Sequence, residues 1–203
     1  MINLDMRLSA NFRLGEFLRS ATAERHDDIR EEQFSPPDEV IENLSYLCKG
    51  VLQPIRDKLG VPMKITSGYR CPSLNKLVKG SSKSQHMFGQ AADVQMSAKL
   101  LHQTKHDYVR NKIRQKVEAI TNQRLRDDIN ANFYLFSYLC IQREKLDIDQ
   151  VIHEYGEKQG RPGWVHVSSS SDDRDKQQML AIGGYLPNRK ETLDLVQALK
   201  YGT

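Results

Sequence analysis

The most regular pattern of apolar and polar positions in the chain lies between residues 36 and 60. Pro36 and Pro37, followed by two acids, suit the first turn of a helix and its positive dipole end. Gly60 and Pro62 favour the end of that helix. Apolar side chains recur at the three- and four-residue steps of one buried helix face, at Val40, Leu44, Leu47, Val51, Leu52 and Ile55. The pattern predicts one strong amphipathic helix.

Weaker helical patterns occupy much of the remaining chain. Residues 21–35 show no clear period and are predicted as loop with a short turn. The first of the weaker helices would turn Phe12, Phe17 and Leu18 inward. One apolar face in the segment 97–128 is formed by Val109, Ile113, Val117 and Ile120. These helices are predicted within residues 8–20, 73–78, 97–128, 130–144, 173–182 and 191–199, with Gly183 and Gly184 separating the last two.

Four short runs have the composition of β-strands. They lie at residues 63–67, 92–96, 146–155 and 164–168. The last two flank a turn at residues 156–163 and are predicted to form a hairpin. Helices and strands interleaved in this way predict an α+β domain.

The bulk composition is that of an ordinary globular protein. The chain has 203 residues, of which 38% are hydrophobic and 28% charged, which argues against disorder. No apolar run is long enough for a membrane span, and no membrane association is expected. The first seven residues lack the apolar core of a signal peptide, which predicts cytoplasmic synthesis without a signal peptide. The odd, widely spaced set Cys48, Cys71 and Cys140 predicts reduced, partly buried thiols.

The formal net charge of +4 originates in one segment. Residues 99–128 hold eight lysines and arginines against four acids, an excess of four, so the rest of the chain sums to about zero. A solvated helix face is the expected interpretation. A lid over a cleft and electrostatic docking on an anionic polymer are the alternatives. Because Tyr108 is the only aromatic residue among these basic positions, a nucleic-acid partner is not expected.

His86, Asp93 and His166 are the candidate metal ligands. The seven-residue step from His86 to Asp93 does not match the three- or four-residue spacing of ligands on one helix face. A loop around Gly89 that runs into a strand at Asp93 would bring these two side chains to one point. His166 lies in an alternating strand and offers a third ligand. Two imidazoles and a carboxylate, with a fourth position left for water, describe a catalytic zinc site.

Three blocks of residues, in this order along the chain, carry a family resemblance. They are Thr66-Ser67-Gly68-Tyr69-Arg70 with Asn75, then Ser84-x-His86-x-x-Gly89-x-Ala91-x-Asp93, and then Trp164-x-His166-x-Ser168. Together they resemble the zinc D-alanyl-D-alanine carboxypeptidase family, which includes phage endolysins and the vancomycin-resistance dipeptidases. The resemblance runs from about Leu8 to the end of the sequence, apart from one insertion.

The resemblance implies both a fold and an activity. The fold would be a single α+β zinc peptidase domain over residues 1–203, with a small, mostly antiparallel sheet flanked by helices and a helical insertion at residues 97–128. One Zn²⁺ per chain would be held by His86, Asp93 and His166, and a monomer is expected. The implied substrate is peptidoglycan, cut by carboxypeptidase or endopeptidase action at stem-peptide bonds that involve D-amino acids. Without a signal peptide, the protein would act on the cell wall after release or as a virion component, as a phage endolysin does.

Two neighbouring residues are alternative general bases. Adjacent residues of a strand point to opposite faces, so only one of His153 and Glu154 should face the metal. Chemistry favours Glu154, because a carboxylate beside a dication stays ionised and can still carry a proton. Related proteins place a carboxylate three residues before the last histidine, and this chain has Gly163 at that position.

Four residues are candidates for substrate binding. Arg70 would bind a substrate carboxylate or developing negative charge through its planar guanidinium, and a surface salt bridge is the alternative. Tyr69 belongs to the same block. Ser84 would contact the substrate or orient His86, or would simply stabilise a turn. Trp164 would line the cleft, with core packing as the simpler interpretation. The alternative function is a non-catalytic wall-binding or virion-assembly module that retains a zinc site.

Overall fold

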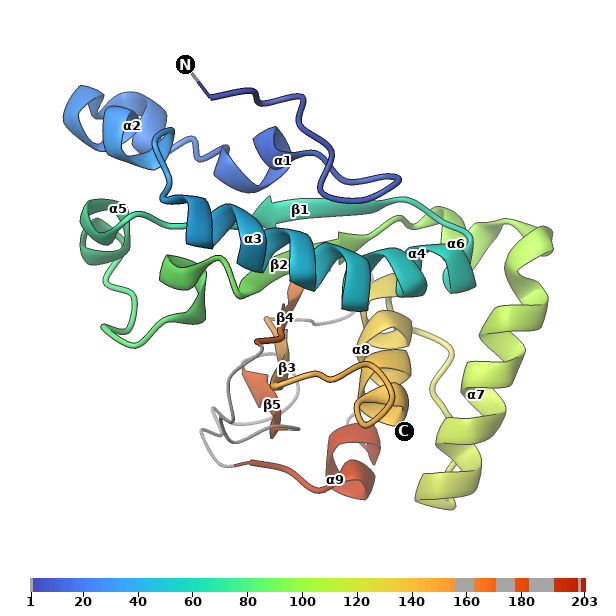
Figure 1. The fold of residues 1–203 in the computed structure, drawn as a ribbon. Helices are drawn as coiled ribbons and strands as arrows, with labels where there is room; N and C mark the ends of the chain where they lie inside the picture. Colours follow the sequence, from blue (N-terminus) through green and yellow to red (C-terminus); the bar gives the residue numbers. More distant parts are fainter. Residues whose placement is uncertain (1, 156–162, 171–177, 183–191, 201) are drawn as a thin grey trace.

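The structure, a computed structural model, describes residues 2–155, 163–170, 178–182, 192–200 and 202–203. A five-stranded sheet lies at its centre, with the strand order β1-β2-β4-β3-β5 (Figure 1). The strands are β1 (Met63–Ser67), β2 (Ala91–Met96), β3 (Gln150–Glu154), β4 (Trp164–Ser168) and β5 (Gln178–Ile182). All neighbouring pairs are antiparallel except β3 and β5, which are parallel. This sheet confirms the predicted α+β class and its mostly antiparallel character.

Helical segments connect and cover the strands. The α-helices are α1 (Leu14–Leu18), α2 (Asp27–Gln33), α3 (Asp38–Leu47), α4 (Gln53–Leu59), α5 (Pro72–Leu77), α6 (Lys99–His102), α7 (Asp107–Thr121), α8 (Ala131–Gln142) and α9 (Leu195–Lys200). Three short 3₁₀ turns are η1 (Ala23–Arg25), η3 (Gln85–Phe88) and η4 (Thr104–His106), and η2 (Cys48–Leu52) is π-helical.

The strong helix predicted from the apolar stripe is one continuous rod formed by α3, η2 and α4. Pro37 caps its N-terminus, and Gly60 ends it in the left-handed conformation with φ of 68°. The π-helical turn ends two residues before Pro54. Proline has no N–H to donate to the carbonyl four residues earlier, so a local widening of the helix is expected there. In Figure 1 this rod passes across β1 and β2.

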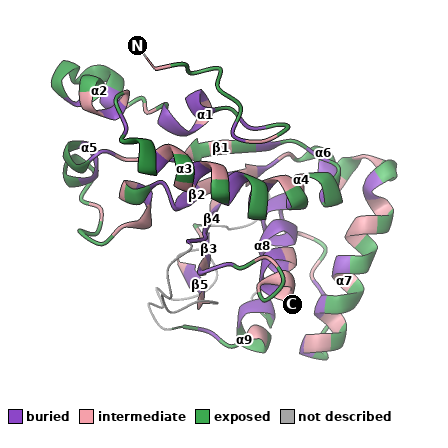
Figure 2. Cartoon of the chain, viewed as in Figure 1, coloured by how far each residue is buried: buried purple, intermediate pink, exposed green. Residues whose placement is uncertain are grey.

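Helix α8 packs against the sheet at β2, β3 and β4. It is buried along most of its length, and its ribbon in Figure 2 is mostly purple. Helix α7 lies on the outside of α8 and α9 and contributes Ile113 and Val117 to the core, while Val109 and Ile120 are partly buried. The apolar face predicted within residues 97–128 is thus the face that packs, and the segment itself folds as α6, η4 and α7.

The prediction of a loop at residues 21–35 is wrong. These residues form η1 and α2, and α2 buries only Ile29 and Gln33. The helix was missed because one of its two inward-facing residues is polar, so no apolar period exists. Gln33 is fully buried because its amide is hydrogen-bonded to the backbone of two other segments, with Nε2 donating to Leu18 and Tyr69 and Oε1 accepting from Cys71.

The predicted helix at residues 173–182 is wrong over its second half. Residues 178–182 form β5, which pairs with β3. Gln, Met, Leu and Ala favour helices locally, but three of the five residues here are buried against neighbouring elements, and this tertiary contact overrides propensity. Residues 171–177, the Gly183–Gly184 break and most of the turn at 156–163 lie outside the described residues. The last predicted helix is observed as α9.

The core joins the N-terminal segment, the long helix, the sheet and α8 into one cluster of buried apolar side chains. Cys48, Cys71 and Cys140 are all buried and unpaired, as expected for reduced thiols. Burial raises the pKa of the Cys48 and Cys140 thiols well above the usual range, so both remain protonated and unreactive. No helix in the described ranges has the length and apolar character needed to cross a lipid bilayer.

Candidate metal centre

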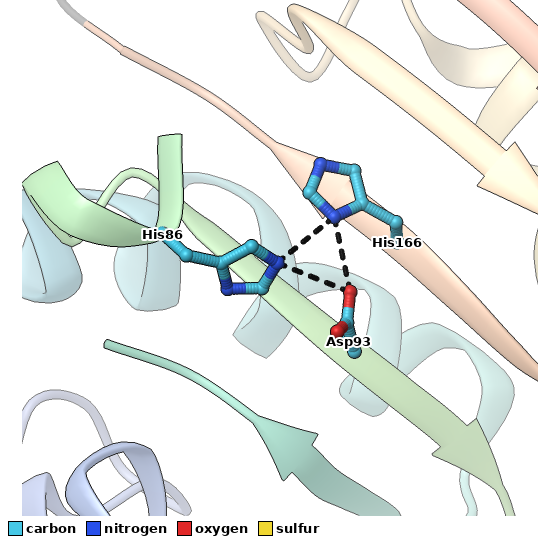
Figure 3. A group of neighbouring side chains, drawn as sticks. All are labelled: His86, Asp93 and His166. Atoms are coloured by element: carbon cyan, nitrogen blue, oxygen red, sulfur yellow. Dashed lines mark hydrogen bonds and ion pairs between the residues drawn. The ribbon is translucent and has the colours of Figure 1, made fainter. Parts of the chain in front are cut away.

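Three side chains from distant parts of the sequence meet on one face of the sheet. His86 lies on η3, Asp93 on β2 and His166 on β4, and Figure 3 shows the three pointing toward one another. Asp93 Oδ1 is 3.2 Å from His86 Nε2 and 3.0 Å from His166 Nδ1. The two imidazole nitrogens are 3.2 Å apart. The structure thus brings the three predicted ligands together as a compact triangle.

This triangle has the size that a tetrahedral zinc ion requires. Zinc bonds to nitrogen and carboxylate oxygen of about 2.0–2.1 Å imply ligand-to-ligand separations of about 3.3 Å. The three observed separations are 3.0, 3.2 and 3.2 Å. Two imidazoles and one carboxylate are also the donor set of catalytic zinc sites that leave a fourth position open. These residues therefore fit a zinc ion without rearrangement.

The sheet register explains why Asp93 and His166 face each other. Asp93 pairs directly with His166 across β2 and β4, and residues opposite each other in an antiparallel ladder share a face. His166 in turn pairs with Ile152 of β3, and Trp164 pairs with Glu154 one step further along. Glu154 therefore lies on the same face as the ligands.

The backbone around Gly68 fixes the orientation of His86. His86 Nδ1 donates a hydrogen bond of 2.6 Å to the carbonyl oxygen of Gly68, which leaves Nε2 with its lone pair directed at Asp93 and His166. Such an outer partner sets the tautomer of a metal-binding histidine. A side chain at Gly68 would meet the Cα and carbonyl oxygen of Phe17 at 2.6 Å, so helix α1 packs directly on this glycine.

Gly89 closes the turn that carries His86. It has φ of 69°, and a Cβ there would approach the carbonyl oxygen of Val40 to 2.4 Å. Only glycine satisfies both the left-handed backbone and this close approach to α3. The loop predicted around Gly89 is thus a 3₁₀ turn held against the long helix, and β2 begins two residues later.

The electrostatics of the site suit a metal ligand set. Burial raises the pKa of Asp93, but the charges and hydrogen bonds of His86 and His166 together outweigh burial and hold that pKa well below its usual range. The carboxylate is therefore ionised. Burial is the main cause that lowers the pKa of His86, with Asp93 opposing it and His166 and Arg70 adding to it. A neutral imidazole with a free lone pair is the form that binds zinc.

Glu154 has the environment of a proton-transfer group. Burial raises its pKa and Asp93 raises it further, while His166, Arg70 and the indole N–H of Trp164 act in the opposite direction. These partners also show that the carboxyl group lies close enough to the metal ligands and to Arg70 to interact with both. A carboxyl with a raised pKa accepts and returns a proton more readily near neutral pH.

The alternative base, His153, lies on the opposite face of the sheet. Its ring stacks on Phe136 of α8 with a centroid distance of 5.5 Å and also packs near Phe133. The residue is 1% exposed, and burial lowers its pKa to about 3. The structure does not bring His153 to the metal ligands, because the alternation of the strand directs it into the core under α8.

Arg70 lies on an irregular segment after β1. Its backbone N–H donates to the carbonyl of His86 at 3.1 Å, which ties it to the ligand turn. Burial lowers the pKa of its guanidinium, whereas Asp93 and Glu154 raise it. Its Nε has no hydrogen-bond partner within the described part of the chain. No salt bridge to Arg70 exists among those residues, so the salt-bridge alternative has no support there.

Arg70 also lines a cavity of about 720 Å³ beside β1. Tyr69 contributes to the same cavity wall, although its side chain is almost fully buried. Gln33 positions this segment through its bonds to the carbonyl of Tyr69 and the N–H of Cys71, which flank Arg70. Sequence patterns did not identify Gln33, because a lone glutamine in a polar segment gives no periodic signal.

The remaining two candidates lie at the edges of the site. Ser84 directly precedes η3 and is partly exposed, and its carbonyl accepts from Met87 in the turn. Trp164 is partly exposed opposite Glu154, with its ring 5.2 Å from that of Tyr155. Ser84 is thus a turn residue next to the ligand block, and Trp164 is the strand partner of Glu154.

The fold and the site together define a metallopeptidase. The sequence profile of the peptidase M15 family matches residues 11–124, which is more than half of the chain. The chain belongs to the peptidase M15 family of zinc D-alanyl-D-alanine carboxypeptidase-like enzymes, as its motifs predict, and members of this family are zinc-dependent. The matched segment contains Arg70, His86 and Asp93 and ends before Glu154 and His166. No curated protein matches the chain.

Proposed function

We propose that the protein is a zinc peptidase that hydrolyses peptide bonds involving D-amino acids in peptidoglycan stem peptides. The observation that carries this proposal is the convergence of His86, Asp93 and His166 on one sheet face, with Glu154 on the same face. One zinc ion per chain would be held by these three ligands. When bound there, zinc supplies the Lewis acidity that activates water and polarises a carbonyl.

Each residue of the site has a separate role in this proposal. Glu154 accepts the proton of the attacking water and returns it to the leaving amine, which its raised pKa supports. Arg70, whose Nε lacks a partner in the described residues, binds a substrate carboxylate or the developing negative charge. Tyr69, Ser84 and Trp164 line the substrate path around these groups.

The proposed setting follows from the same family. The enzyme would act as a monomer, formed by one domain of residues 1–203, on the cell wall after release or as part of a virion. The alternative is a non-catalytic wall-binding or virion-assembly module that keeps the zinc. A polar, proton-accepting group beside the ligands favours catalysis, since a structural zinc site has no use for one.

The decisive experiment is mass spectrometry of soluble fragments released from purified peptidoglycan, with added zinc and with a chelator. Zinc-dependent fragments are expected, and their masses identify the bond and distinguish carboxypeptidase from endopeptidase action. A His166→Ala variant is the control, because it removes one ligand. If walls of several crosslink types release nothing while one zinc is bound per chain, the binding-module alternative is correct.

A further inference from the structure

A second carboxylate, Asp149, is buried beside the metal centre and is not used by the proposed mechanism. It lies just before β3 and is 2% exposed. Its Oδ2 accepts two hydrogen bonds of 2.7 Å, from Gln85 Nε2 and from Ser170 Oγ. Its Oδ1 is buried and has no hydrogen-bond partner within the described residues, and no ion pair to Asp149 occurs among them.

Such a carboxylate indicates a missing partner. Burying an ionised group is costly unless donors satisfy both of its oxygens, and most buried polar atoms in proteins are satisfied. A cavity of about 460 Å³ adjoins Asp149 and is also lined by Gln85, Phe88 and Gln150. A ligand group that enters this cavity and donates a hydrogen bond to Oδ1 would satisfy the second oxygen of the carboxylate.

The cavity lies next to the metal ligands. Gln85 immediately precedes His86 on η3. Gln150 pairs with Ser168, which is two residues beyond His166 on β4, so Gln150 and His166 share the site face of the sheet. Two residues along a strand span about 7 Å. A substrate bound at the metal can therefore reach the cavity with a side chain on the reacting residue or on its neighbour.

We propose that this cavity is a subsite for an ammonium group of the substrate, recognised by Asp149. An ammonium supplies the positive charge and the donors that the carboxylate lacks, and the partly exposed ring of Phe88 forms an apolar wall for the methylene stem that carries it. Stem peptides contain a diamino acid whose side chain ends in such a group. This inference rests on the proposed peptidoglycan substrate and adds the feature by which that substrate is selected.

The test compares two synthetic stem peptides that differ only at the diamino acid, with its side-chain amine free or acetylated. The wild-type enzyme is expected to prefer the free amine by about 10- to 100-fold in kcat/KM, the range for a charge-assisted hydrogen bond. Asp149→Asn keeps the shape of the side chain and is expected to reduce this ratio to about one. Equal rates for both peptides with the wild-type enzyme, or an unchanged ratio in the variant, would refute the subsite.

Asp147→Asn is the matched control. Asp147 is an exposed carboxylate two residues away that bonds Tyr46 and does not line the cavity in the described residues. Its variant is expected to keep the wild-type ratio. Zinc content is measured for the wild type, Asp149→Asn and Asp147→Asn, and it shows whether the hydrogen bond from Gln85 to Asp149 also holds His86 in place. A loss of zinc in Asp149→Asn would assign Asp149 to ligand positioning and refute amine recognition.

Lys83 lines the same cavity and is the competing source of an ammonium group. If Lys83 were the permanent partner of Asp149 in solution, Lys83→Ala and Asp149→Asn would lower the melting temperature equally, and the wild-type enzyme would not discriminate between the two peptides. That pair of results would refute the proposal. An enzyme that discriminates, with Lys83→Ala keeping or raising the ratio, would support it.

A binding measurement separates failure of this inference from failure of the proposed function. If the wild-type protein cleaves neither peptide, the peptidase proposal fails, and the subsite is then tested with Nα-acetyl-lysine amide. The side-chain amide resonances of Gln85 and Gln150 are expected to shift with this probe in the wild-type protein. They should not shift with the Nε-acetylated probe or in Asp149→Asn. No shift in the wild-type protein would refute the subsite independently of catalysis.

Discussion

At the scale of single residues, the choice of a general base depends on which face of the sheet each residue of β3 points to. His153 and Glu154 are adjacent, and both have side chains able to accept a proton, so composition does not separate them. The pairing of His166 with Ile152 and of Trp164 with Glu154 places only the glutamate on the ligand face. Alternation shows that neighbouring residues of β3 point to opposite faces of the sheet. Only the register against β4 shows which of the two alternate sets lies on the face of the metal ligands.

Replacing Glu154 by Gln is expected to lower kcat by about 10²- to 10⁴-fold, the range for removal of a general base, with zinc retained. The amide keeps the volume of the side chain but cannot accept the proton. Hydrolysis of a defined stem peptide and zinc content by atomic spectroscopy measure the two effects. Glu144→Gln, an exposed glutamate on a different surface, should behave as wild type. Full activity in Glu154→Gln would remove this residue from the mechanism.

His153 is expected to make the fold sensitive to acid. Its pKa is lowered from 6.5 to about 3 by burial, so below pH 6.5 the unfolded chain binds a proton that the folded chain does not. Stability from this group is therefore complete above pH 6.5 and is lost as the pH falls toward 3. From pH 7 to 4.5 the loss is about 2.5 kcal/mol.

Urea unfolding of the metal-free protein at several pH values measures this effect. His153→Phe keeps an aromatic ring beside Phe136 and removes the titrating group, so its free energy of unfolding should fall less over the same pH range. Chelator is present in both series, because it removes the proton release that accompanies zinc binding. Identical pH slopes for the two proteins would contradict the assignment.

At the scale of elements, the packing of α1 on Gly68 fixes the position of the carbonyl oxygen that accepts the hydrogen bond from His86. The carbonyl of Gly68 holds His86, and the backbone of Phe17 leaves no room for a Cβ. Gly68→Ala is therefore expected to displace this turn and weaken zinc affinity by about 10- to 100-fold, as loss of an outer partner does. Competition with a chromophoric chelator measures the affinity.

Gly50→Ala is the matched control for that experiment. Gly50 lies in the helical rod with open space around a built Cβ, so alanine should leave zinc affinity unchanged and raise helix stability by about 0.5–1 kcal/mol. Equal zinc affinity in both alanine variants would show that the Gly68 contact does not orient His86.

Helix α7 has a buried face that should not tolerate polar substitutions and an exposed face that should tolerate them. Its arginines and acids form ion pairs, among them Arg110–Asp107 and Arg114–Glu118, whereas Lys112 and Lys116 are exposed. Val117→Asp should destabilise the fold by several kcal/mol, since it buries a charge against α8 and α9. Replacing both lysines by Gln should leave the melting temperature within about 1 °C, because surface changes are usually within 0.5 kcal/mol.

The same lysine variant separates the three interpretations of the basic segment. Unchanged hydrolysis of soluble peptides and unchanged sedimentation with insoluble walls would indicate a solvated helix face. Weaker wall binding that depends on salt would indicate docking on an anionic polymer. A change in turnover of soluble peptides would indicate a lid.

The sequence predicts most elements whose buried faces are apolar, with β5 as an exception, and it does not predict α2, whose buried face is partly polar. The rod from Asp38 to Leu59, β1, β2, β4 and α8 follow from periodicity and breakers. Helix α2 was missed because Gln33 is its key buried residue. Strand β5 was assigned as helix because only its parallel pairing with β3 distinguishes it from an apolar helical turn.

At the scale of the whole molecule, zinc would join three parts of the structure that packing holds separately. The ligands come from η3, β2 and β4, and no two of these are consecutive elements of a single hairpin. Zinc at 1,000 times its dissociation constant is expected to stabilise the fold by about 4 kcal/mol. Calorimetry with and without chelator measures this shift, and His166→Ala should abolish it. A melting temperature that does not respond to zinc would contradict the site.

Only part of the candidate site could be predicted from the sequence. The sequence motifs alone indicate His86, Asp93 and His166, because each block carries its own spacing. Sequence patterns do not identify Asp149 and Gln33, because their importance comes from burial and from side-chain hydrogen-bond partners 15 to 64 positions away in the sequence. Sequence spacing reports local chemistry, whereas an unsatisfied buried oxygen is a property of the assembled fold.

The antiparallel pairing of β2 with β4 has a consequence for the timing of activity. The pairs between them join residues 91–94 to residues 165–168, so more than 70 residues must be synthesised after Asp93 before its partner strand exists. A ribosome-bound chain that ends before His166 carries only two of the three ligands. Peptidase competence would therefore arise late, after the long-range strand pairing that slows folding. In the producing cell, the chain would remain an inactive apoprotein until its C-terminal strands have folded.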